Sequence, residues 1–213
     1  MQTEFLIARL ARQGAAVRVL PPPRTLLMRW ALVSTMSILA GIAWYGIRAD
    51  ASTQVVSPSF LMRALLVAAV ATVAALHALA WSVPGTEPDG LGRLGPQLVL
   101  AAWSGMFVWP LLGPTIIERL VAVRWHPQCA WQLAAVAAAP GAWMYWQLRR
   151  AAPYALGWTS VQAALASVGV GALAVQWICG LDGAAHQLLW HVAPLLVGAG
   201  AAGLAGRHLL RQH

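Results

Sequence analysis

Long apolar runs alternate with short polar segments over most of the chain. Six of these runs are about 20 residues long, the length that a helix needs to cross the hydrocarbon core of a bilayer. The pattern predicts an all-α, polytopic integral membrane protein with six transmembrane helices, at about Leu26–Ile47, Phe60–Trp81, Pro96–Ile117, Cys129–Leu148, Leu156–Ile178 and Leu188–Gly206. Residues 1–25 form an N-terminal segment, residues 26–206 the membrane domain and residues 207–213 a short tail.

Prolines interrupt three of these runs. Pro110 and Pro114 lie in the third run, Pro140 in the fourth and Pro194 near one end of the sixth. Proline kinks a spanning helix, but neighbouring helices or water can satisfy the freed carbonyl groups. We therefore expect the runs to remain helical, with kinks at the prolines.

The arginines divide unequally between the two sides that six spans create. One side carries Arg9, Arg12, Arg18, Arg24, Arg29, Arg93, Arg149, Arg150, Arg207 and Arg211, and the other only Arg48, Arg63, Arg119 and Arg124. The positive-inside rule places the richer side, with both termini, in the cytoplasm. Tryptophans gather near both ends of the runs, as in the aromatic belts of membrane proteins. We expect a multi-pass protein of the bacterial inner membrane.

The composition supports a membrane protein and excludes several functions. Hydrophobic residues make up 60% of the 213 residues and charged residues 9%, whereas soluble domains carry about 25% charged residues. The net charge of +8 comes from scattered arginines and not from one basic patch, so we expect no direct contact with nucleic acid. P-loop, HExxH and GxSxG motifs are absent, and we expect neither an enzyme nor a resident cofactor.

The only two cysteines occupy corresponding places in one predicted helical hairpin. Cys129 opens the fourth run and Cys179 follows the fifth, so both thiols are expected at the outer face, which in a Gram-negative cell is the periplasm, where disulfides form and persist. Cysteine and histidine are the usual ligands of zinc and related metals, and His126, His186 and His191 are nearby in the sequence. Three interpretations remain open at this point: a structural disulfide, a redox- or metal-responsive pair, and two unrelated buried thiols.

Two further features of the spans have structural explanations. His77 lies about one turn from the inner end of the second run, and we expect it to be a neutral, hydrogen-bonded histidine. Glycines in the fifth and sixth runs (Gly169, Gly171, Gly198, Gly200, Gly203 and Gly206) are expected to let helices of the same chain pack closely.

The N-terminal segment predicts a short amphipathic helix over residues 3–13. Leu6, Ile7 and Leu10 share one face of this helix, and Pro21-Pro22-Pro23 form a stiff connection to the first span. A helix of about eleven residues is too short to be stable alone, so it should become ordered by binding either lipid or a protein partner.

The ordered combination of these features resembles a known family. The combination comprises Val17 to Arg24 with its proline cluster, Arg48-Ala49-Asp50, Ser57-Pro58-Ser59-Phe60-Leu61, the Cys129–Cys179 hairpin and the glycine-rich last span with Arg207. It is similar to the NrsF family, membrane-bound negative regulators (anti-sigma factors) of a sigma factor of the sigma-F type.

The resemblance implies a mechanism in which the N-terminal segment holds an extracytoplasmic-function (ECF) sigma factor at the membrane. Cys129 and Cys179 match the family's paired cysteines, which would take part in sensing heavy-metal or related stress, with transient metal binding, before the sigma factor is released. From the amphipathic pattern we expect Phe5, Leu6, Arg9 and Leu10 to contact the sigma factor. The alternative function is a small transporter or metal permease with an outer Cys/His loading site; the scarcity of charged groups within the spans disfavours it.

Overall fold

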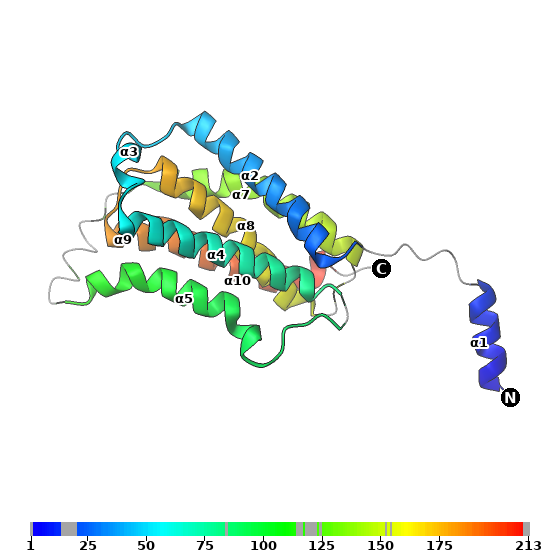
Figure 1. Cartoon of the computed structure of the whole chain (residues 1–213). Helices are drawn as coiled ribbons and strands as arrows, with labels where there is room; N and C mark the ends of the chain where they lie inside the picture. The colour runs from blue at the N-terminus through cyan, green and yellow to red at the C-terminus, as the bar shows by residue number, and fades with distance from the viewer. Residues whose placement is uncertain are drawn as a thin grey trace.

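The computed structural model describes residues 2–13, 21–83, 85–113, 117, 123, 125–151, 153 and 155–210. Every regular element within these ranges is a helix, and they contain no strand (Figure 1). The longer helices are α1 (Gln2–Gln13), α2 (Pro23–Tyr45), α4 (Pro58–Ala80), α5 (Gly95–Val108), α7 (Pro127–Ala151), α8 (Leu156–Ile178) and α10 (Ala193–Leu209). Short helical turns connect them: α3 (Ala51–Gln54), η1 (Gly90–Leu94), η2 (Trp109–Leu111), α9 (Ala184–Gln187) and η3 (Leu188–Val192).

Five helical segments in the described ranges are long and apolar enough to cross a membrane: Pro23–Tyr45, Pro58–Ala80, Gly90–Leu111, Leu156–Ile178 and Ala184–Gly206. These segments confirm an all-helical chain of the membrane type. The fourth predicted run corresponds to α7, which is 25 residues long but contains three glutamines and ends in two arginines. With these polar residues, α7 is less apolar than the five segments above and is not among them, so the total of six spans remains a prediction.

The predicted boundaries hold to within a few residues except at two places. The fifth run coincides with α8, whereas the prediction that the third run continues to Ile117 is wrong. Its helix narrows to a 3-10 turn at Trp109 and ends at Leu111, and Leu112 is extended. Pro110 explains the ending, because proline cannot donate the helical hydrogen bond and its ring crowds the preceding turn. The sixth run begins at Ala184, four residues earlier than predicted.

Helix α8 is the centre of the bundle and the most buried of the five apolar spans. It packs against α4, α7 and α10. A Cβ atom at Gly171 would overlap the carbonyl oxygen of Leu133 in α7, and one at Gly206 in α10 would overlap Ser160 in α8. These approaches confirm the predicted packing role for Gly171 and Gly206, whereas the prediction is wrong for Gly200, where no atom lies within 4 Å of an added Cβ. The pairing of Leu133 with Gly171 and of Gly141 with Ser167 shows that α7 runs antiparallel to α8.

The bundle has two ends, which we name by their contents. The thiol end contains α3, α9 and both cysteines, and the tail end contains the beginning of α2 (Figure 1). At the tail end, His77 is mostly buried and its ring nitrogens lie 2.8 Å and 2.7 Å from the carbonyl oxygens of Val73 and Gly92. This confirms the hydrogen-bonded histidine that the sequence predicts.

Candidate functional site: a buried cysteine–histidine cluster

The two cysteines meet at the thiol end. Cys129 lies on the first turn of α7, and Cys179 directly follows the last residue of α8. Because these helices are antiparallel neighbours, their adjoining ends bring the two thiols together. The Sγ atoms are 3.5 Å apart, with Cys129 donating the hydrogen bond, and both cysteines are free and buried.

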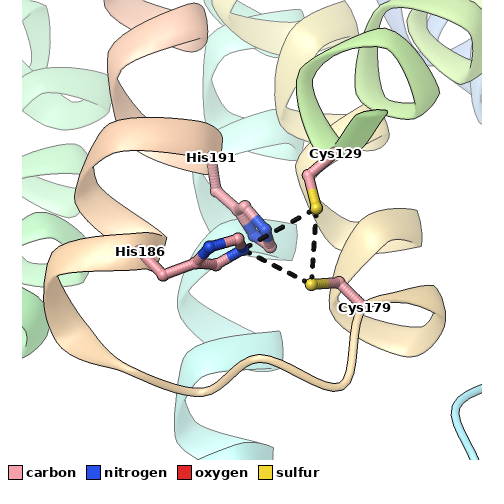
Figure 2. Close-up of side chains that lie close together, drawn as sticks. All are labelled: Cys129, Cys179, His186 and His191. Atoms are coloured by element: carbon pink, nitrogen blue, oxygen red, sulfur yellow. Dashed lines mark hydrogen bonds between the residues drawn. The ribbon is translucent and has the colours of Figure 1, made fainter. Parts of the chain in front are cut away.

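His186 completes a triangle with the two thiols. It lies in α9, and its Nε2 atom is 3.5 Å from Sγ of Cys179 and 3.7 Å from Sγ of Cys129 (Figure 2). The loop from Cys179 to α9 is short enough to fold His186 directly back over the end of α8. His186 is buried like the two cysteines.

His191 joins the cluster because of an irregular helical turn. His191 is five positions after His186, and in a regular α-helix two side chains five positions apart point about 140° away from each other. Residues Leu188–Val192 form a π-helix instead, in which the amide of Ala193 donates to the carbonyl of Leu188. Pro194 offers a cause, since its ring excludes the usual α-helical bond at that place. Single π turns often occur at functional sites.

The two cysteines and His186 have the spacing of ligands in a tetrahedral metal site, and His191 lies close enough to be the fourth ligand. All four ligand atoms lie within 4.8 Å of one another, and no comparable second group is present among the described residues. Typical Zn–S and Zn–N lengths in a tetrahedron place sulfur atoms about 3.8 Å apart and a sulfur and a nitrogen about 3.6 Å apart. The S–S distance of 3.5 Å and the S–N distances of 3.5 and 3.7 Å are close to these values.

A poorly satisfied nitrogen adds a second indication of a ligand. His191 is only 1% exposed, yet within the described residues its Nε2 atom makes no hydrogen bond of normal geometry, and the sulfur of Cys179 is a polar neighbour of its side chain. Buried polar atoms are nearly always paired, because an unpaired one loses its hydration without compensation. In Figure 2 the ring of His191 points toward the same space as the two thiols and His186. A cation between the four groups would satisfy this nitrogen.

The hydrogen bonding makes the two thiols unequal. The S–H group of Cys129 donates to Cys179, and this bond lowers the pKa of Cys179 well below that of an ordinary thiol; the hydrogen bond with His186 acts in the same direction. The thiolate is the form of cysteine that binds metals and attacks electrophiles. Cys179 is therefore the more reactive member of the pair.

A cavity of about 620 Å³ adjoins the cluster on the side of α9. Its lining includes His186 and His126, together with Leu111 from η2 and the loop residues Gly180 to Gly183. A cation or a small reagent can reach His186 from this space. The cavity thus supplies an entry path to a site whose four ligands are themselves buried.

Ion pairs hold the loop that carries Cys179. Arg48, which follows α2, donates hydrogen bonds to the carboxylates of Asp50 and Asp182. The side chain of Arg48 is almost completely buried. Its guanidinium lowers the pKa of Asp50 far below the ordinary value, and Asp50, then Asp182, raise the pKa of Arg48 in return.

The structure separates the predicted site residues into three groups. Cys129, Cys179, His186 and His191 are together, whereas His126 lies outside this group, with its ring centroid 5.7 Å from that of His186. The side chains predicted to contact a sigma factor lie in α1, where Phe5, Leu6 and Arg9 are exposed. The side chain of Leu10 is outside the described residues, as are residues 14–20.

Sequence reasoning noted Arg48-Ala49-Asp50 but missed its role. The sequence does contain a signal for this ion pair. With six spans, the loop that contains Arg48 and the loop that contains Asp182 lie on the same face, and the two residues carry opposite charges. Nothing in the pattern indicated that the two loops touch.

Comparison with protein families gives one match. The model of a family described as "NrsF: Negative regulator of sigma F" matches residues 10–212, nearly the whole chain. No curated protein and no solved structure matches the chain. The matched range includes the four clustered side chains, Arg48 and most of the helical bundle.

Proposed function

The chain belongs to the NrsF family, negative regulators of sigma F, and we propose that it is a membrane-bound anti-sigma factor that releases its partner when the cysteine–histidine cluster takes up a thiophilic cation. The partner is a sigma factor of the ECF type. The protein acts by sequestration and not by catalysis. It lies in the bacterial inner membrane with six spans and with both termini in the cytoplasm.

The single observation that carries the sensing part of the proposal is the convergence of four buried ligand atoms. A structural disulfide requires only two thiols and gives no reason for His186 and His191 to lie beside them. Two imidazoles and two thiols within 4.8 Å form a complete ligand set for a cation such as Zn²⁺ or Cd²⁺. The adjoining cavity supports uptake from outside the bundle.

Helix α1 supports the sequestration part of the proposal. Its large apolar side chains are exposed: Phe5 is 72%, Leu6 54% and Ile7 62% accessible. Large exposed apolar groups on an amphipathic helix are suited to the groove of a partner protein. Arg9 and Arg12 line a shallow hollow with Phe5 and add positive charge to this surface. We infer that α1 binds an acidic, partly apolar groove of the sigma factor.

The antiparallel packing of α7 on α8 supports the six-span topology. Contacts from Cys129–Cys179 through Leu133–Gly171 to Gly141–Ser167 follow both helices from the thiol end inward. Twenty-five helical residues extend about 38 Å, more than the thickness of the hydrocarbon core. At the tail end Arg149 and Arg150 lie over the rings of Tyr145 and Trp146, an arrangement typical of a membrane interface.

Co-purification of the sigma factor tests sequestration. The sigma factor is expressed with the full protein, with a variant that lacks the residues before Pro21, and with Cys129→Ser as a control that keeps the tail. We expect the sigma factor to be recovered with the full protein and with Cys129→Ser but lost with the truncated variant. Equal recovery with the truncated variant would contradict the role of the N-terminal segment.

A further inference from the structure

A buried arginine at the thiol end has a role that the proposed function does not explain. Arg48 is 4% exposed, although an arginine at the end of a span could simply extend into water. Its guanidinium lies 5.6 Å from the centroid of the Phe60 ring and contacts two carboxylates. Burying a charge in this way is costly unless the geometry is well satisfied, so the position of Arg48 needs an explanation.

Arg48 is held between the end of α2 and the end of α8. Its backbone amide donates to the carbonyl of Trp177 in the last turn of α8 at 2.9 Å, and its Nε and Nη2 atoms donate to Asp50 at 2.6 and 2.9 Å. Asp50 in turn accepts a hydrogen bond from Gln54 in α3. These contacts fix the orientation of the guanidinium relative to the end of α2.

The other partner of Arg48 belongs to the ligand loop. Asp182 lies between Cys179 and His186, three residues after the first and four before the second, and accepts from both terminal nitrogens of Arg48. Gln54 and Arg63 make weaker contacts with the same carboxylate, at 3.4 and 3.5 Å. Cys179 and His186 flank the short loop that carries Asp182, so a shift of their backbone moves this carboxylate.

We propose that the Arg48–Asp182 pair couples the cysteine–histidine cluster to α2, the helix that continues directly into the N-terminal segment. This inference rests on the proposed function, because it assumes that a cation binds the cluster. Binding fixes Cys179 and His186 around the ion, the loop with Asp182 becomes ordered with them, and Arg48 transmits this change to the end of α2. Arg48 and Asp182 are positioning residues and do not touch the cation.

A second connection between the cluster and α2 makes the inference testable. Helix α7 carries Cys129 on its first turn and contacts α2 further along, where Ser37 donates to the carbonyl of Val136 at 2.6 Å and Gly41 faces the Val136 side chain. If this route alone carried the signal, Asp182 would be dispensable. If the ion pair carries it, removing Asp182 abolishes the response at the end of α2, although the backbone bond from Arg48 to Trp177 and the contacts with α7 remain and the cluster can still bind.

Hydrogen exchange followed by mass spectrometry measures the coupling directly. The full-length protein in nanodiscs is examined with and without Cd²⁺, as wild type and as Asp182→Asn, Asp182→Glu and Asp50→Asn. Asp50→Asn is the matched control, because it also removes a carboxylate from Arg48 but leaves the link to the ligand loop intact. The absorption band of cadmium thiolate reports occupancy of the cluster in each variant.

We expect Cd²⁺ to change exchange in residues 46–54 in the wild type, in Asp50→Asn and in Asp182→Glu, and to leave it unchanged in Asp182→Asn at equal occupancy. An unaltered response in Asp182→Asn would overturn the coupling role. So would a Cd²⁺ effect in the wild type that is confined to residues 179–187. Loss of the cadmium band in Asp182→Asn would also overturn it, since Asp182 would then act on the site itself. Wild type that binds no Cd²⁺ would contradict the proposed function instead.

Discussion

At the scale of single residues, the cluster combines two kinds of groups with different tasks. Cys129 and Cys179 supply thiols of unequal acidity, and His186 and His191 supply two imidazole nitrogens within 4.8 Å of them. A disulfide would use only the first pair. The histidines are therefore the residues that distinguish a metal site from a redox site.

Cadmium titration separates the two kinds of site. We expect His186→Gln and His191→Gln each to weaken Cd²⁺ binding by at least tenfold, because even residues that only support a ligand cost about 10- to 100-fold. His126→Gln is the matched control, since His126 lies outside the four-residue group, and its affinity should stay close to wild type. Competition with a chelating dye measures the dissociation constants. Equal affinities in all three variants would exclude the histidines as ligands.

The inequality of the thiols predicts a specific pH dependence. A lowered pKa keeps Cys179 in the thiolate form at pH values below about 8.5, where an ordinary thiol is mostly protonated. Iodoacetamide should therefore modify Cys179 faster than Cys129 at pH 7. Removing the donated hydrogen bond with Cys129→Ala should raise the pKa of Cys179, so its labelling slows at pH 7 and recovers above pH 9. Labelling of Cys179 that is independent of residue 129 would contradict this assignment.

At the scale of elements, α8 organises both the fold and the site. Its glycine at 171 admits the backbone of α7, and this close packing aligns Cys129 with the end of α8. The π turn at Leu188–Val192 then brings His191 back to the cluster. The site thus depends on helix packing and on one irregular turn, and not on a contiguous sequence motif.

Glycine substitutions test this packing. Gly171→Ala places a methyl group against the backbone of Leu133, which cannot move as a side chain would, and should destabilise the protein by about 1–3 kcal/mol. Gly200→Ala in α10 is the matched control, because no atom lies within 4 Å of the added Cβ position. Its stability should be unchanged or slightly raised, since alanine favours the helix. Thermal unfolding in detergent measures both, and similar unfolding temperatures for the two variants would contradict the packing role of Gly171.

The same elements show how far sequence reasoning reaches. Apolar runs locate most of the helices, because the bilayer fixes both their length and their composition, and α8 coincides with its predicted range. The predicted end of the third run at Ile117 is wrong, because the apolar pattern does not reveal that the helix ends just after Pro110. The residues of the cluster were named from their chemistry. The position of His191 depends on the π turn, and the only sequence signal of this turn is Pro194.

At the scale of the whole molecule, the proposed sensor and the proposed output lie at opposite ends of the bundle. The cluster is at the thiol end, whereas α2 begins at the tail end, directly after the prolines that follow α1 (Figure 1). A signal must therefore travel about 30 Å, the thickness of the hydrocarbon core. Such coupling requires two arrangements of the bundle that the cation and the sigma factor favour unequally. If the cation releases the sigma factor, then the bound sigma factor must weaken cation binding by the same factor, because one coupling free energy links the two sites.

The measurement that most directly tests this account is release of the bound sigma factor by Cd²⁺ added to the purified complex in nanodiscs. We expect release from the wild type but not from Cys129→Ser or His186→Gln, and the thiol oxidant diamide should not replace Cd²⁺. Retention of the sigma factor by the wild type at Cd²⁺ concentrations that saturate the cluster would contradict the account. Release by diamide that is independent of His186 would contradict it as well, and would identify a disulfide switch in place of a metal sensor.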